Sequence, residues 1–112
     1  AARGHGDVVD RLLRAGADAD ARTVMGDTPL MLASRAGHQA VAQRLLGARA
    51  DPDQQNRNGD TALILASQSG SVATVSTLLA AGAKPRLRNS AGHAAIDVAR
   101  ALGLDAVAVL VR

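Results

Sequence analysis

The sequence has no Cys, no Glu and none of the aromatic residues Phe, Tyr and Trp. Without Cys, disulfides and thiolate metal sites are excluded. Without aromatic rings, the chain lacks the surfaces on which the bases of single-stranded nucleic acids stack. Apolar residues nevertheless make up 47% of the chain, chiefly as 25 Ala, 14 Leu and 10 Val. A core of such side chains needs close approach of backbones, which favours thin helical layers over one large globular core.

Charge and hydropathy set further limits. The 112 residues include 12 Arg, 1 Lys and 10 Asp, for a formal net charge of only +3. The pI of about 11.0 reflects the many Arg and the missing Tyr and Cys, so it does not by itself indicate nucleic-acid binding. No apolar run approaches the roughly 18 residues of a membrane span, and no signal-peptide pattern opens the chain. We expect one soluble domain with neither a membrane nor a nucleic-acid partner. The compartment is left open with a slight preference for the cytoplasm, and the Arg-rich, Lys-poor composition hints at a bacterial genome.

A spacing of 33 residues recurs along the whole chain. Gly26, Gly59 and Gly92 form one such column, and four further columns keep the same spacing. These columns are Gly4/Gly37/Gly70/Gly103, Leu12/Leu45/Leu78, Ala17/Ala50/Ala83 and Leu30/Leu63/Ile96. A register held in five columns is not an accident of composition, so the sequence predicts a repeat protein.

Each repeat has the pattern of two short helices. Thr28 is a predicted N-cap, Pro29 follows at the first helical position, and Gly37 ends the helix. A second helix is expected over about 38–47. The next copy repeats these features as Thr61, Gly70 and a helix over about 71–81, and the pairs Leu45–Leu46 and Leu78–Leu79 are expected to face inward. Neither helix could bury its apolar face alone, so neighbouring copies must stack.

Two stretches, GDTPLMLASRAGHQAVAQRLLGARADPD and GDTALILASQSGSVATVSTLLAAGAKPR, resemble the ankyrin repeat, and the front and back of the chain resemble it in part. The resemblance implies an all-α ankyrin-repeat solenoid of stacked helix-turn-helix units with hairpin-like loops. It divides a single domain over 1–112 into a partial first repeat (1–25), a second repeat (26–58), a third repeat (59–91) and a degenerate C-terminal capping repeat (92–112).

Three departures from the family pattern have structural consequences. Met31, Ile64 and Asp97 replace the family's His, so the polar tie which that His makes between neighbouring turns should be missing. Arg49 replaces a turn Gly, at a cost of about 1 kcal/mol if its φ is positive. In the last copy Ala94 replaces the capping Thr, so we expect the helix that follows to lose its cap.

Paired carboxylates are the first candidates for chemistry. Asp18 and Asp20, and again Asp51 and Asp53, could hold a metal or act as acid and base. The interpretation we favour is that they accept hydrogen bonds from nearby backbone N–H groups in the turns. No His or Glu is placed to complete a site, so no metal or other cofactor is predicted.

The histidines do not form a catalytic group either. His5 and His38 share one column of the repeat and are interpreted as scaffold, whereas His93 is expected at the tip of the last hairpin. One His without partners in register is not a catalytic triad, so the sequence predicts no enzyme.

The segment KPRLR (84–88) is the one dense basic run. Its two interpretations are a solvated loop and a patch for an acidic partner.

The resemblance also implies where a partner would bind, namely on the hairpin tips and on the concave face of the first helices. The implied residues are Arg22, Val24, Met25, Asp27 and Arg35 in one repeat, Gln55, Arg57, Asn58, Asp60, Gln68 and Ser69 in the next, and Arg88, Ser90, Ala91 and His93 in the last hairpin. Arginine recurs along this strip and is favoured at interface hot spots. The alternative is that these are solubilising charges, with Asp27 and Asp60 pairing internally with arginines.

The predicted function is that of a non-enzymatic scaffold that binds another protein, one with an acidic surface being the favoured kind. The alternative is an accessory or regulatory segment of a larger protein that mediates self-assembly or autoinhibition. A start within a helix, at Ala1, and the apolar ending LDAVAVLV keep that alternative open.

Overall fold

The computed structural model describes residues 24–111 of the chain. This part of the chain contains six α-helices and no strand. The helices are α2 (Pro29–Ala36), α3 (Gln39–Gly47), α4 (Ala62–Ser69), α5 (Val72–Ala80), α6 (Ala95–Ala101) and α7 (Asp105–Val111). Apart from its last two residues, the expected partial first repeat (1–25) lies outside the described residues, as do Arg22, His5, Asp18 and Asp20.

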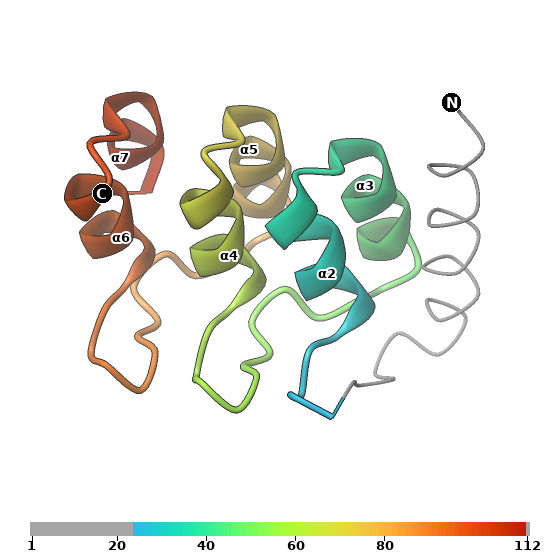
Figure 1. The fold of residues 1–112 in the computed structure, drawn as a ribbon. Helices are drawn as coiled ribbons and strands as arrows, with labels where there is room; N and C mark the ends of the chain where they lie inside the picture. The colour runs from blue at the N-terminus through green and yellow to red at the C-terminus, as the bar shows by residue number, and fades with distance from the viewer. Residues whose placement is uncertain (1–23, 112) are drawn as a thin grey trace, which may run out of the picture.

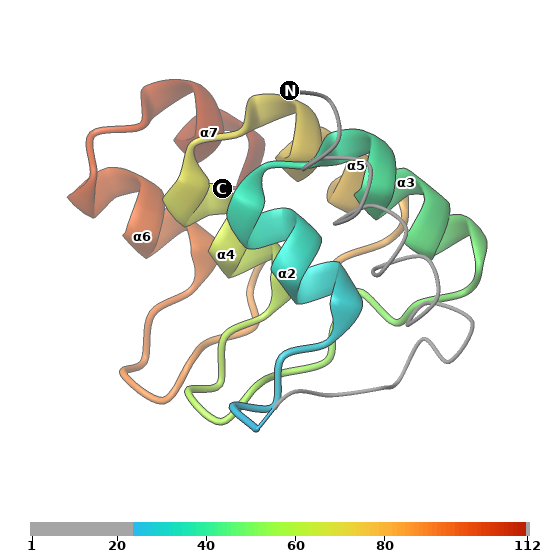
Figure 2. The same cartoon turned by 45° about the vertical axis from the view of Figure 1, so that its right-hand side comes forward.

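The helices form two parallel rows. The first helices of successive repeats, α2, α4 and α6, pack against one another, and so do the second helices α3, α5 and α7 (Figure 1). Each first helix also packs against the second helix of its own repeat. The loops between repeats extend from one side of this stack, as both views show (Figure 2). The predicted all-α repeat solenoid is confirmed.

The first helices begin and end as the sequence predicts. The Thr28 Oγ1 accepts the Met31 N–H at 3.2 Å, and the Thr61 Oγ1 accepts the Ile64 N–H at the same distance. Gly37 and Gly70 end the two helices in the left-handed conformation, with φ of 72° and 74°. Glycine adopts this conformation without the steric cost that a Cβ imposes.

The expectation that α6 loses its cap is correct for the side chain of the N-cap residue but wrong for the backbone N–H of that residue. Ala94 has no side-chain acceptor for the third N–H of the helix, as predicted. The Asp97 Oδ2, however, accepts the Ala94 N–H at 2.8 Å. A carboxylate at the third helical position reaches back to the N-cap backbone, so one of the two bonds of a capping box survives.

The second helices differ slightly from their predicted bounds. The α3 helix begins after His38, whose side chain makes no capping bond. The α5 helix begins after Ser71, whose Oγ accepts the Thr74 N–H at 3.3 Å. Both helices therefore begin one residue later than expected, because the predicted first residue is in each case the non-helical N-cap.

The core is entirely aliphatic. Ala33, Ala66 and Ala99 recur at 33-residue spacing, are fully buried, and keep the first helices close together. Leu45 and Leu78 are buried in the second helices, while their neighbours Leu46 and Leu79 are partly buried against the same core, so the predicted inward pairs are confirmed. Small side chains replace aromatic rings here because thin helical layers leave no space for rings.

The turn after α3 has the strained residue that the sequence predicts. Arg49 has a φ of 69° and is the one non-glycine residue with positive φ in the described range. Gly82, the equivalent residue one repeat later, has a φ of 92°.

We predict that Arg49→Gly raises the free energy of unfolding by about 1 kcal/mol, because glycine removes the steric cost of a Cβ at positive φ. Urea unfolding followed by circular dichroism measures the change. The matched control is Gly82→Ala, because a Cβ there would meet no atom within 4 Å and only the backbone conformation is tested. Gly82→Ala should lose a similar free energy, and an unchanged stability of Arg49→Gly would contradict the strain at Arg49.

Candidate functional site

Each hairpin tip is organised by one asparagine. The Asn56 Oδ1 accepts the backbone N–H groups of Asn58 and Asp60, both at 3.0 Å. Asn89 closes the last tip in the same way. Neither asparagine was among the predicted site residues, although their spacing of 33 residues was available as a signal. With its acceptor oxygen satisfied inside the tip, each asparagine side chain holds the tip in one conformation.

The same asparagines join each loop to the loop before it. The Asn56 Nδ2 donates to the Asp27 Oδ1 at 2.8 Å, and the Asn89 Nδ2 donates to the Asp60 Oδ1 at 3.0 Å. Backbone bonds run beside them, from the Arg57 N–H to the Met25 carbonyl and from the Ser90 N–H to the Asn58 carbonyl. Because each loop is bonded to its neighbour, the hairpin tips form one continuous, ordered edge.

Asp27 is the centre of the first of these junctions. Its carboxylate is buried, and its two oxygens receive the Arg35 guanidinium at 3.1 and 3.2 Å in addition to the Asn56 amide. Burial alone would raise the pKa of Asp27, but the hydrogen bonds from Asn56 and Arg35 and the charge of Arg35 together lower this pKa below its ordinary 3.8. The ionised carboxylate is therefore the form that the fold stabilises.

The exposure that a partner-binding role of Asp27 and Asp60 would need is absent, since Asp27 is only 5% exposed and Asp60 is only 8% exposed. Both carboxylates face the following loop, whose asparagine covers them. The internal pairing expected for Asp27 is confirmed by its bonds to Arg35. Asp60 bonds Asn89 instead of an arginine. Both aspartates thus position the tips from inside the loop stack.

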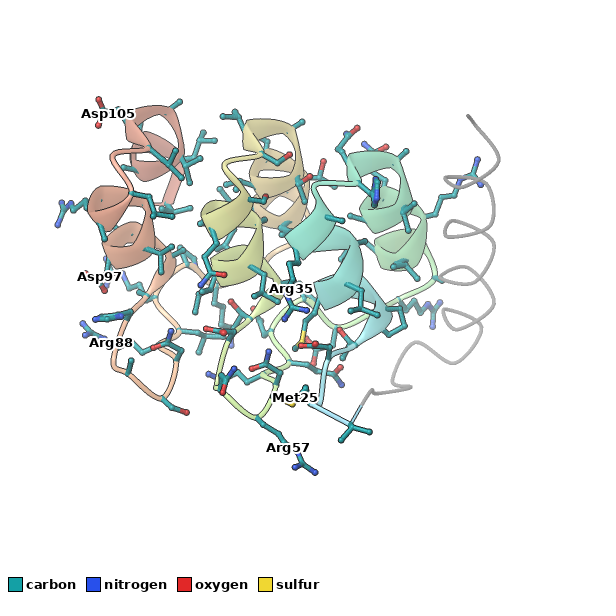
Figure 3. The ribbon with its side chains drawn as sticks, viewed as in Figure 1. Met25, Arg35, Arg57, Arg88, Asp97 and Asp105 are labelled. Carbon is teal, nitrogen blue, oxygen red and sulfur yellow. The ribbon has the colours of Figure 1, made fainter. Side chains whose placement is uncertain are left out.

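The other predicted residues are on the surface. Figure 3 shows Met25 and Arg57 at the hairpin tips, with Arg57 extending away from the protein. The exposed members of the predicted strip are Val24, Met25, Arg35, Gln55, Arg57, Asn58, Gln68, Ser69, Arg88, Ser90, Ala91 and His93. The only ion pair within residues 24–111 joins Arg35 to Asp27. The charges of Arg57 and Arg88 are consequently not neutralised by a carboxylate in this part of the chain.

A cleft on the first-helix face brings two predicted residues together. Gln68 from α4 and His93 from the last hairpin both line an open cleft of about 450 Å³, and Asp97 adds a carboxylate. Val98, Ala101 and Leu102 form its apolar lining. Leu102 was not among the predicted site residues; it is 55% exposed and replaces Ala36 and Ser69 of the preceding repeats. An exposed Leu in a column of small residues was the available signal.

The paired aspartates that the structure describes accept hydrogen bonds from backbone N–H groups. The Asp51 Oδ1 accepts the Asp53 N–H at 2.9 Å, and the Asp53 Oδ1 accepts the Lys84 N–H of the next loop at 2.9 Å. This confirms the interpretation of Asp51 as a turn acceptor, whereas Asp53 accepts a backbone N–H of the next loop instead of a nearby one. Between residues 24 and 111, no three His or Asp side chains gather as ligands for a metal ion. None of the described helices is long and apolar enough to cross a membrane.

We predict that Asp27→Asn lowers the free energy of unfolding at pH 7 by about 1–3 kcal/mol, because it removes the charged partner of Arg35. Since the pKa of Asp27 is lowered in the folded state, its contribution is complete well above pH 3.8 and is lost as the pH falls below that value. Urea unfolding between pH 7 and pH 3 should show the difference between wild type and variant shrinking toward low pH. Asp105→Asn, which alters an exposed carboxylate far from the loops, is the control (Figure 3). A difference that stays constant down to pH 3 would contradict this role of Asp27.

Comparison with known proteins agrees with this geometry. The family model for ankyrin repeats in three copies matches residues 1–89 and 41–111, which together span nearly the whole chain. A search of curated proteins gave no match. The matched range includes the three helix pairs and the stacked hairpins described above. The chain belongs to the ankyrin-repeat family.

Proposed function

We propose that this protein is a non-enzymatic scaffold that binds a partner protein on its hairpin tips and on the concave face of its first helices. Ankyrin repeats in general are protein–protein interaction modules. The observation that carries the proposal is the cleft that Gln68 of one repeat and His93 of the next line together with the apolar side chains of Val98, Ala101 and Leu102. Protein interfaces commonly combine an apolar centre with polar groups around it.

The cleft suits an apolar side chain of the partner. Leu102 and Val98 would bury such a side chain, at about 25 cal/mol for each Å² removed from water. Gln68 and His93, the uncharged polar residues of the lining, offer hydrogen bonds that would fix the orientation of that side chain. The tips are already ordered by Asn56 and Asn89, so binding costs little conformational entropy.

The charge of the tips favours a partner with carboxylates. Arg57 is exposed on one tip and Arg88 on the side of the next hairpin, and their guanidinium groups pair well with carboxylates in two parallel hydrogen bonds. Met25 and Val24 add exposed apolar surface on the adjacent tip. We infer an acidic partner surface that also presents apolar side chains.

A separate observation supports the alternative function, which is self-assembly within a larger protein. Val109 is 58% exposed and Leu110 is 36% exposed on α7, away from the cleft. An assembly would cover these side chains, so sedimentation equilibrium of the purified chain separates the alternatives. A monomer at about 100 µM would argue against self-assembly through α7, since a specific dimer has a dissociation constant well below that concentration.

We predict that the Leu102→Asp variant no longer captures a partner that the wild-type protein captures from a lysate, because the substitution places a charge in the apolar lining of the cleft. Quantitative mass spectrometry of the captured proteins measures the loss, which should exceed about tenfold. Leu110→Asp makes the same chemical change on α7 and should retain the partner. Thermal unfolding of both variants verifies that they are folded. Equal capture by Leu102→Asp and wild type would exclude the cleft as the binding surface.

A further inference from the structure

Side chains of successive hairpins donate or accept hydrogen bonds toward the following loop. The pattern of these donors and acceptors changes at the last hairpin. In the hairpin spanning 53–60, three side chains serve the following loop. The Asp60 Oδ1 accepts from the Asn89 Nδ2, the Asp53 Oδ1 accepts from the Lys84 N–H, and the Gln55 Nε2 donates to the Arg88 carbonyl at 2.8 Å. This edge therefore presents two acceptors and one donor to the next repeat.

The corresponding edge of the last hairpin is cationic. The residues 33 positions later are Arg86 in place of Asp53, Arg88 in place of Gln55, and His93 in place of Asp60. Arg88 keeps one bond of its counterpart, since its Nη1 donates to the Gly92 carbonyl at 3.0 Å as Gln55 donates to Gly59 at 2.9 Å. Within the described residues, neither Arg86 nor Arg88 is in an ion pair. Arg86 thus places guanidinium N–H donors where Asp53 offers an acceptor, and Arg88 keeps the donor role of Gln55 but adds a positive charge.

An apolar pocket lies directly beside these arginines. Its volume is about 380 Å³, and Ala94, Ile96 and Val111 line it together with Arg86 and Arg88. Leu30 and Leu63, the counterparts of Ile96, are each 1% exposed beneath the following repeat, whereas Ile96 is partly exposed. Asp97 also lines the pocket, but its Oδ2 is bonded to the Ala94 N–H. With two positive side chains, Arg86 and Arg88, and one negative side chain, Asp97, the lining of the pocket carries one net positive charge.

This end of the stack is poorly suited to another ankyrin repeat. Such a repeat would bring backbone and amide N–H donors against Arg86 and His93, where Asp53 and Asp60 accept such donors one repeat earlier. It would also bury Asp97, which replaces the buried Met31 and Ile64. Burying this carboxylate with the Ala94 N–H as its one bonded partner and no ion pair is unfavourable.

We propose that this end-face pocket, formed by Arg86, Arg88, Ala94, Ile96 and Val111, binds an acidic segment of a partner protein that carries one aliphatic side chain. The two guanidinium groups bond carboxylates of the segment, and the aliphatic side chain fills the pocket beside Ile96. The surface differs from the concave cleft, because only Asp97 lines both. It can therefore be present whether or not the cleft binds a partner.

The experiment titrates ¹⁵N-labelled protein with the peptide acetyl-Asp-Asp-Leu-Asp-Asp-amide and follows amide chemical shifts. Shift changes should map to Arg86, Arg88, Ile96 and Val111, and the affinity should fall with added salt. The neutral peptide acetyl-Asn-Asn-Leu-Asn-Asn-amide should not bind, and replacing the peptide Leu by Gly should weaken binding at least about fivefold.

Protein variants complete the test. Arg86→Glu together with Arg88→Glu should weaken binding of the acidic peptide more than about tenfold, whereas Arg44→Glu, an equal charge change on the exposed side of α3, should change it less than about twofold. Thermal unfolding verifies the fold of each variant. Equal binding of the neutral peptide, undiminished binding by the double variant, shift changes confined to the cleft, or no binding at about 5 mM peptide would each overturn the proposal.

Discussion

The hydrogen bond between the asparagine of one hairpin and the aspartate of the preceding hairpin is the interaction on which this structure depends. It is made twice, by Asn56 with Asp27 and by Asn89 with Asp60. A buried carboxylate needs such partners, and a hydrogen bond to a charged group contributes about 1.5–3 kcal/mol. Because the same asparagines also close their own tips, one side chain sets both the shape of a hairpin and its position relative to the next.

The surface follows from that constraint. With the loops held in register, the first helices α2, α4 and α6 stand side by side, and residues from two consecutive repeats line a common cleft. Buried alanines let these helices approach without aromatic side chains. The carboxylates that the loops use internally are no longer available on the surface, so the exposed charged side chains of the hairpins at 53–60 and 86–93 are arginines. The stack and its binding surfaces are thus two consequences of the same loop chemistry.

The local features of the fold could be predicted from the sequence, because they depend on residues close together in the chain. The caps at Thr28 and Thr61, the helix ends at Gly37 and Gly70, and the positive φ of Arg49 are of this kind. The burial of Asp27 and Asp60 could not be predicted, because their partners are 29 residues away and belong to the next hairpin. The cleft was missed in part, since Leu102 becomes a lining residue only when α4 and α6 are placed side by side. A single repeat therefore indicates its helices, whereas its binding surface needs the neighbouring repeat.

Close contact between neighbouring loops can be measured directly with two glycines of one column. Gly59 and Gly92 have nearly the same φ, 75° and 82°, so alanine strains both backbones equally. A Cβ at Gly59 would lie 2.7 Å from the Ser90 nitrogen of the next loop, whereas a Cβ at Gly92 would meet nothing within 4 Å. The loss in free energy of unfolding should therefore be larger for Gly59→Ala than for Gly92→Ala by at least about 1 kcal/mol. Equal losses would contradict the close packing of the loops on which the stack depends.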